Sequence, residues 1–284
     1  MHLTRTKAVI LMAITAVLWS LGGILIKSVN LSPLAIAGGR SAIASVVIFV
    51  AIKKPKFTWS IPQIGAALAY VMLVVTFVSA TKMTTATNAI MLQFTAPVYV
   101  ALMAAWILKE KTTKFDWVII GVVLSGMVLF FLDKLSPSGF WGNIVAVFSG
   151  VAFALFTIFM RMQKDGSPLE SVLLGNIFTA IIGLAFLWKE VPTKTDWTYL
   201  FILGIVQLGI PYVLYSTAIK SLTALDAVLI PVIEPLLNPI WVFIILREVP
   251  GKWSLIGGAI VLTAVTVRCI FSIKKEEAHL SQAT

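Results

Sequence analysis

The chain has 284 residues, of which 59% are hydrophobic and only 12% are charged, and its mean hydropathy is +0.99. A soluble domain usually carries about 25% charged residues, because it must cover its core with a wetted surface, so this composition excludes a soluble globular fold. The net charge of +10 comes from short basic clusters between apolar segments, such as Lys53, Lys54 and Lys56, which favours contact with anionic lipid headgroups over nucleic acid.

Apolar segments recur along the whole chain, and a run of about 20 such residues is long enough to cross a bilayer as a helix. The first segment follows Arg5 and Lys7, and we interpret it as a retained helix because it is too long for the apolar core of a signal peptide. We predict an all-α membrane protein with ten transmembrane helices. Their expected ranges are 8–27, 33–52, 62–81, 86–108, 115–132, 141–160, 168–188, 197–219, 224–246 and 253–273.

The second half of the sequence repeats the first at an offset of 134 to 138 residues. The matches follow the same order in both halves: Lys27 with Arg161, Pro33 with Pro168, Ala80 with Ala218, Pro97 with Pro235, Glu110 with Glu248 and Trp117 with Trp253. We therefore expect a first five-helix repeat at 1–135 and a second at 136–284, together forming one transmembrane domain. Because five is odd, the second repeat must start on the opposite side of the membrane, which predicts a 5+5 inverted-topology repeat.

The distribution of basic residues predicts the orientation. Of the 22 Lys and Arg residues, 14 fall on the side of the N-terminus and seven on the other side, with Arg40 inside a span. Cytoplasmic loops carry an excess of Lys and Arg. We therefore expect a multi-pass protein of the cell (inner) membrane with both termini in the cytoplasm.

These residues resemble the EamA-type branch of the drug/metabolite transporter superfamily. The first span carries Leu18-Trp19-Ser20 and ends in a lysine, and the second carries Ser32-Pro33-Leu34 followed by Arg40. The fourth and ninth spans share a threonine-alanine start, a central proline and a terminal glutamate. The resemblance covers 8–273 and implies ten helices, cytoplasmic termini and a substrate cavity between the halves. Ser20 departs from it, because the family often has glycine after the tryptophan.

Charged residues that only one repeat possesses are the sharpest candidates for substrate binding. Glu234 lies near the middle of the ninth span, where the first repeat has Ala96. A carboxylate at bilayer depth costs about 2.5–3.5 kcal/mol, so it should face a cavity or a partner. Glu234 either binds a cationic group or carries a proton, or it makes a structural hydrogen bond. Pro231, Pro235 and Pro239 recur along one face of this helix and free backbone carbonyls. Asn238 lies one turn beyond Glu234 and can join the same polar patch.

Arg40 is the second unmatched charge, since its counterpart is Gly175. It either pairs with Glu234, holds a substrate carboxylate bidentately, or snorkels to the outer interface. Trp19 lies near the middle of its span and not in the interfacial belt, so it forms either a cavity wall or a packing contact. Other polar side chains at middle depth can bind substrate or join helices: Gln93, Asn176, Gln207 and Tyr212.

The sequence argues against other classes of protein. The only histidines, His2 and His279, lie at the termini, and Cys269 is the single cysteine, so we expect no nucleophilic enzyme site, no metal site and no cofactor. We predict a secondary transporter, an exporter, of small polar metabolites such as amino acids, working by alternating access. The alternative is an organic cation or drug transporter of the same fold, and an intramembrane enzyme or a channel is less favoured. The expected partners are the substrate, the lipid bilayer and protons carried by Glu234, and a monomer is consistent with this arrangement.

Overall fold

The computed structural model describes residues 3–132, 139–237 and 252–283, and all regular secondary structure in these residues is helical, as predicted. The first half contains α1 Arg5–Trp19, α2 Gly22–Ser28, α3 Pro33–Ile52, α4 Ile61–Met83, α5 Ala86–Gln93, α6 Ala96–Ile107 and α7 Lys114–Phe131. The second half contains α8 Phe140–Met162, α9 Pro168–Leu187, α10 Lys194–Ile202, the π-helix η1 Leu203–Gly209, α11 Ile210–Ala218, η2 Ile219–Ser221, α12 Ala224–Leu229, η3 Ile230–Val232 and α14 Lys252–Ala283.

Within the described residues, eight helices are long and apolar enough to cross a membrane. They coincide with the first to fourth, sixth to eighth and tenth predicted spans. The fifth predicted span corresponds to α7, which has 18 residues and is not among the eight. The ninth predicted span runs into 238–251, outside the described residues. The count of ten helices therefore stays a prediction.

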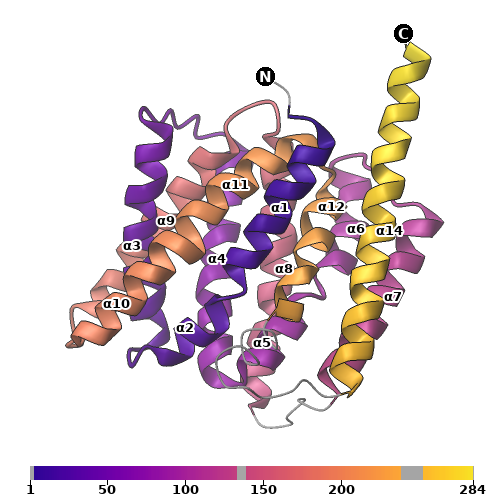
Figure 1. The fold of residues 1–284 in the computed structure, drawn as a ribbon. Helices are drawn as coiled ribbons and strands as arrows, with labels where there is room; N and C mark the ends of the chain where they lie inside the picture. The colour runs from indigo at the N-terminus through magenta and orange to yellow at the C-terminus, as the bar shows by residue number, and fades with distance from the viewer. Residues whose placement is uncertain (1–2, 133–138, 238–251, 284) are drawn as a thin grey trace.

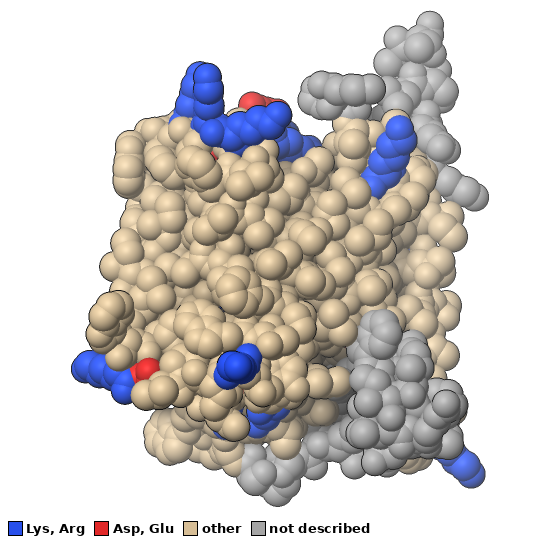
Figure 2. Space-filling model, turned by 60° about the vertical axis from the view of Figure 1, so that its left-hand side comes forward, with Lys and Arg blue, Asp and Glu red and all other residues tan. Residues whose placement is uncertain are grey.

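The outer surface has the pattern of a membrane-embedded protein. On the face shown in Figure 2, the charged side chains lie near the two ends of the molecule and leave an uncharged band between them. Large apolar side chains are exposed on several helices, among them Val46, Leu68, Leu102 and Ile181. Soluble proteins rarely expose apolar patches of this extent. The chain is an integral membrane protein.

Side-chain caps fix where several of the helices begin. The first N–H groups of a helix have no acceptor within the helix, so Ser, Thr or Asp is favoured there. Ser32 caps α3 and Ser60 caps α4, each by accepting a hydrogen bond from a backbone N–H. Three helices begin with a full capping box, in which a threonine and the aspartate three residues later bond reciprocally: Thr113 with Asp116, Thr193 with Asp196, and Thr223 with Asp226.

The helices of the first half pack mainly against helices of the second half. The pairs are α1 with α11, α3 with α9, α4 with α8, α6 with α12 and α7 with α14. A close crossing brings Gly38 of α3 against Gly183 of α9, where a Cβ on either residue would lie 2.4 Å from the backbone of the other. In Figure 1 the beginning of α1 and the end of α14 lie at the same end of the molecule, which we call the N-terminal end.

Candidate functional site

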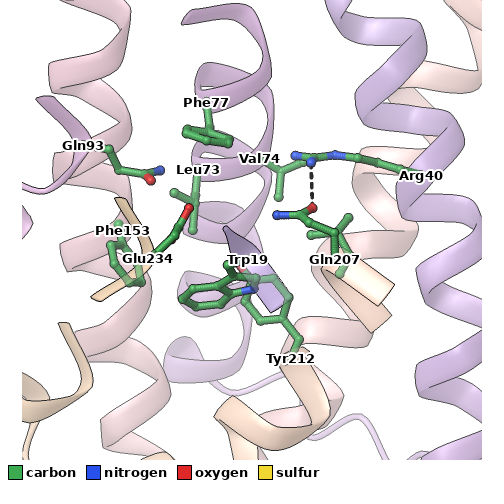
Figure 3. Close-up of a pocket in the computed structure, with 11 residues that line it drawn as sticks. Trp19, Arg40, Leu73, Val74, Phe77, Gln93, Phe153, Gln207, Tyr212 and Glu234 are labelled. Carbon is green, nitrogen blue, oxygen red and sulfur yellow. Dashed lines mark hydrogen bonds between the residues drawn. The ribbon is translucent and has the colours of Figure 1, made fainter. Parts of the chain in front are cut away.

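A small cavity lies between the two halves, and six of the eight predicted binding residues line it: Trp19, Arg40, Gln93, Gln207, Tyr212 and Glu234. Its volume is about 40 Å³, whereas sites that enclose a metabolite measure roughly 300–1,000 Å³. Figure 3 shows Arg40 and Gln207 on one side and Glu234 and Gln93 on the other, with Trp19 and Tyr212 lying below them. The cavity therefore presents a guanidinium and a carboxylate from opposite walls.

Four of the polar or aromatic lining residues come from places where a span is interrupted. Trp19 is the last residue of α1, before the break that leads to α2, and Gln93 is the last residue of α5, before the break that leads to α6. Gln207 belongs to the π-helix η1, and Glu234 follows the 3₁₀ turn η3. Irregular backbone at membrane depth is tolerated only inside the protein or beside a cavity.

The residues around each interruption explain why the helix changes there. After α1 the Ser20 hydroxyl donates to the carbonyl of Val17 at 2.6 Å, and after α5 the Thr95 hydroxyl donates to the carbonyl of Leu92 at 2.7 Å. Both bonds help to satisfy carbonyls at the end of a helix. Proline, which has no N–H to donate, stands at the start of α6, of α11 and within η3.

Close packing of η1 on α3 joins Arg40 to Gln207. A Cβ on Gly204 would lie 2.6 Å from the Ile43 side chain, so only glycine permits this approach. Across the contact, Arg40 Nη1 donates to Gln207 Oε1 at 3.0 Å. Arg40 is 1% exposed, so the prediction that it snorkels to the outer interface is wrong.

The carboxylate of Glu234 faces the cavity with few partners. The residue is 5% exposed, and among the described residues no Lys or Arg forms an ion pair with it, so the predicted pairing with Arg40 is not formed in this conformation. Gln93, on the same side, donates from Nε2 to Ser149 Oγ at 2.7 Å. A buried carboxylate without an opposite charge costs free energy unless it meets a cation or a proton.

An aromatic cluster forms the lower wall of the cavity. The Trp19 ring lies 5.1 Å from Tyr212, 5.6 Å from Tyr215 and 6.0 Å from Phe153 between centroids. These separations fall within the range of favourable aromatic pairs, so the position of Trp19 is fixed by its neighbours. Trp19 therefore lines the cavity and also packs against neighbouring rings, which are the two alternatives that the sequence left open for it.

The remaining two predicted residues do not contribute to the described cavity. Asn176 is fully buried in α9, where it accepts a hydrogen bond from the Tyr70 hydroxyl at 3.1 Å and donates to the carbonyl of Val172 at 3.0 Å. It joins α9 to α4 and does not line the cavity. Asn238 lies outside the described residues.

Sequence reasoning missed the apolar lining residues of the cavity. These are Leu73, Val74 and Phe77 of α4, Phe153 of α8 and Leu208 of η1. They have no distinguishing signal, because apolar residues fill every span and only the fold shows which of them face inward.

Interrupted helices from two repeats that surround a polar cavity are the architecture of a membrane transporter. The chain belongs to the EamA-like transporter family, whose model matches it twice, at residues 6–132 and 140–268. Two repeats of this family are therefore present, and the protein is a transporter and not an enzyme.

Similar proteins support this assignment. An uncharacterised transporter of Archaeoglobus fulgidus is 27% identical and covers 92% of this chain and 96% of its own. A protein of Rickettsia prowazekii named S-adenosylmethionine uptake transporter is 26% identical over 69% of this chain and 67% of its own. One solved crystal structure shares the fold, with a TM-score of 0.76 and 17% identity over 93% of this chain and 97% of that one.

Proposed function

We propose that the protein is a secondary transporter that exports small polar metabolites, amino acids among them, by alternating access. The observation that carries this proposal is the convergence of four interrupted spans on one cavity between the repeats. Substrate sites of secondary transporters lie at such helix interruptions near the middle of the membrane. Arg40 and Glu234 supply the charges that would recognise the substrate.

The proposed architecture has ten spans in a 5+5 inverted repeat, with the repeats at 1–135 and 136–284. The pairing of helices supports it: α3 with α9, α6 with α12 and α7 with α14 each join corresponding spans of the two repeats. The pair α4 with α8 corresponds to α11 with α1 in the same way. Such reciprocal contacts are expected of two units related by a twofold axis.

The small volume of the cavity supports a mechanism in which the repeats move. A cavity of about 40 Å³ holds about three water molecules, by the volume that each requires, and therefore excludes an amino acid. The conformation described here would then be an occluded one. Rocking of the two repeats would enlarge the cavity toward one side of the membrane and then the other.

Arg40 and Glu234 support a zwitterionic substrate, because a carboxylate and an ammonium group could each meet an opposite charge. The second candidate is an organic cation, held by Glu234 and by the faces of Trp19 and Tyr212. The Rickettsia prowazekii relative is named for S-adenosylmethionine, a compound with both an amino-acid group and a sulfonium cation, so it fits either class. That name indicates uptake, whereas we propose export, and a flux assay decides the direction.

The first experiment is a thermal-shift screen of the purified protein against pooled metabolites, followed by flux of each hit in proteoliposomes. We expect amino acids or related zwitterions to raise the melting temperature and to be transported. Stabilisation by organic cations alone would favour the second candidate. Stabilisation without flux under any gradient would contradict the transporter mechanism.

Proton coupling through Glu234 is part of the proposal, because the residue is buried in the cavity and has no counterpart in the first repeat. In proteoliposomes, Glu234→Gln should abolish acceleration of flux by a pH gradient, while the exposed Asp165→Asn should leave it intact. The pH dependence should flatten because glutamine carries no exchangeable carboxyl proton. Wild-type pH dependence in Glu234→Gln would remove Glu234 as the coupling residue.

A further inference from the structure

Ion pairs between described side chains gather at the N-terminal end of the molecule. Asp226, at the start of α12, accepts hydrogen bonds from Arg5 of α1 and from Arg268 of α14. Arg268 Nε also lies 3.0 Å from Asp116 Oδ1 at the start of α7. Arg161, near the end of α8, lies 2.7 Å from the Glu110 carboxylate that follows α6.

Three of these pairs join one repeat to the other. They are Arg5 with Asp226, Arg268 with Asp116, and Arg161 with Glu110. Glu110 also accepts a hydrogen bond from the backbone N–H of Ala224 at 2.8 Å, so it holds the beginning of α12 as well. Asp226 is only 2% exposed, and removal of one partner from a buried ion pair leaves an uncompensated charge.

At the opposite end, the described contacts between the repeats are hydrogen bonds in which no Lys or Arg side chain takes part, and they include one from the backbone N–H of Ser32 to Glu190 at 3.0 Å. Asn88, the repeat counterpart of Asp226, donates to Asn143 at 3.2 Å. Thr84 donates to the same Asn143 oxygen at 2.9 Å, and the backbone N–H of Asn30 donates to Asp196 at 2.8 Å. Among residues 3–132, 139–237 and 252–283, ion pairs between the repeats therefore occur at the N-terminal end, and hydrogen bonds take their place at the opposite end.

We propose that the three ion pairs between the repeats, with Arg268–Asp226, form the gate at the N-terminal end. This inference rests on the alternating access proposed above. Opening toward this end must separate ion pairs, whereas the contacts that the described residues make between the repeats at the other end are hydrogen bonds without an ion pair. A cavity of about 470 Å³ lined by Arg5, Asp116, Arg161 and Arg268 lies against the gate, so water and ions reach these charges and screen them.

The single cysteine of the chain provides a probe of this gate. Cys269 follows Arg268 in α14 and is partly buried. It lies close enough to Asp226, Arg268 and Arg5 to interact with their charges. Its rate of reaction with a charged, membrane-impermeant maleimide, measured on purified protein by mass spectrometry, should report how often this end opens. Cys269→Ala identifies labelling that occurs elsewhere.

The decisive comparison is between two Asp→Asn changes in equivalent capping boxes. Asp226→Asn weakens the gate, whereas Asp196→Asn makes the same change in the box at the opposite end. We expect Asp226→Asn to raise the labelling rate constant per thiolate, taken from the pH dependence of labelling, about tenfold. Loss of an ion pair shifts the equilibrium between closed and open states. Asp196→Asn should not raise the rate constant. Salt should accelerate labelling of the wild type more than labelling of Asp226→Asn.

A second variant separates gate opening from loss of fold. Arg161→Gln breaks the pair between α8 and Glu110, in the segment that follows α6. It should raise the labelling rate while the melting temperature shows that the protein stays folded. Unchanged labelling in both Asp226→Asn and Arg161→Gln, or an equal rise in Asp196→Asn, would overturn the gate. The labelling assay needs no substrate, so a negative result contradicts the gate and leaves the proposed function standing. If labelling shows that the gate opens but no substrate is transported, the proposed function is contradicted and the gate is not.

Discussion

Arg40 is the residue that would bind the carboxylate of the proposed zwitterionic substrate. It is enclosed by protein, and one of its nitrogens bonds Gln207, while its Nε has no hydrogen-bond partner among the described residues. A guanidinium held in this way keeps donors available for a bidentate contact with a carboxylate. Its position favours substrate recognition over a closed ion pair within the protein.

Replacement of this side chain distinguishes the two substrate classes. Arg40→Met should reduce flux of a zwitterionic substrate by about tenfold or more, since a hydrogen bond to a charged group contributes about 1.5–3 kcal/mol. Flux of an organic cation should persist. Melting temperature serves as the control for folding, because Arg40→Met removes the hydrogen bond to Gln207 Oε1. Equal loss of both substrates would contradict a specific role for Arg40.

At the scale of elements, the contact between α3 and α9 depends on two glycines. Gly38→Ala would place a Cβ 2.4 Å from the Gly183 backbone, and overpacking of this kind costs about 1–3 kcal/mol. We expect a lower melting temperature in detergent. Gly121→Ala in α7 is the matched control, because nothing lies within 4 Å of its added Cβ and alanine favours a helix. A melting temperature unchanged by Gly38→Ala would show that the helices separate freely.

The elements also show what the sequence could predict. Hydropathy located the described spans well, because the apolar segments must match the bilayer thickness. Comparison of the two halves of the sequence singled out Arg40 and Glu234 as candidate binding residues, because their counterparts, Gly175 and Ala96, are uncharged. The interruptions were harder to predict. Ser20 and Gln207 occur in continuous apolar windows, and the break and the π-helix arise from packing between segments far apart in the sequence.

At the scale of the whole molecule, the orientation is a prediction that rests on the excess of Lys and Arg at the N-terminal end. Reporter fusions at either terminus in a bacterial host should behave as cytoplasmic, with a fluorescent protein bright and alkaline phosphatase inactive. Active phosphatase at both termini would reverse the orientation and would place the ionic gate on the outer side. Opposite results at the two termini would contradict an even number of spans.

The small central cavity has a consequence for measurements of affinity. If the occluded form predominates, a substrate binds only the rare molecules whose cavity has widened. The apparent dissociation constant then equals the intrinsic constant divided by the fraction of widened molecules, so a 1% population weakens apparent affinity about a hundredfold. Substitutions far from the cavity that favour the widened form would tighten binding without touching the substrate. A weak apparent affinity would then reflect the small fraction of molecules in the widened form as much as the contacts that the compound makes in the cavity.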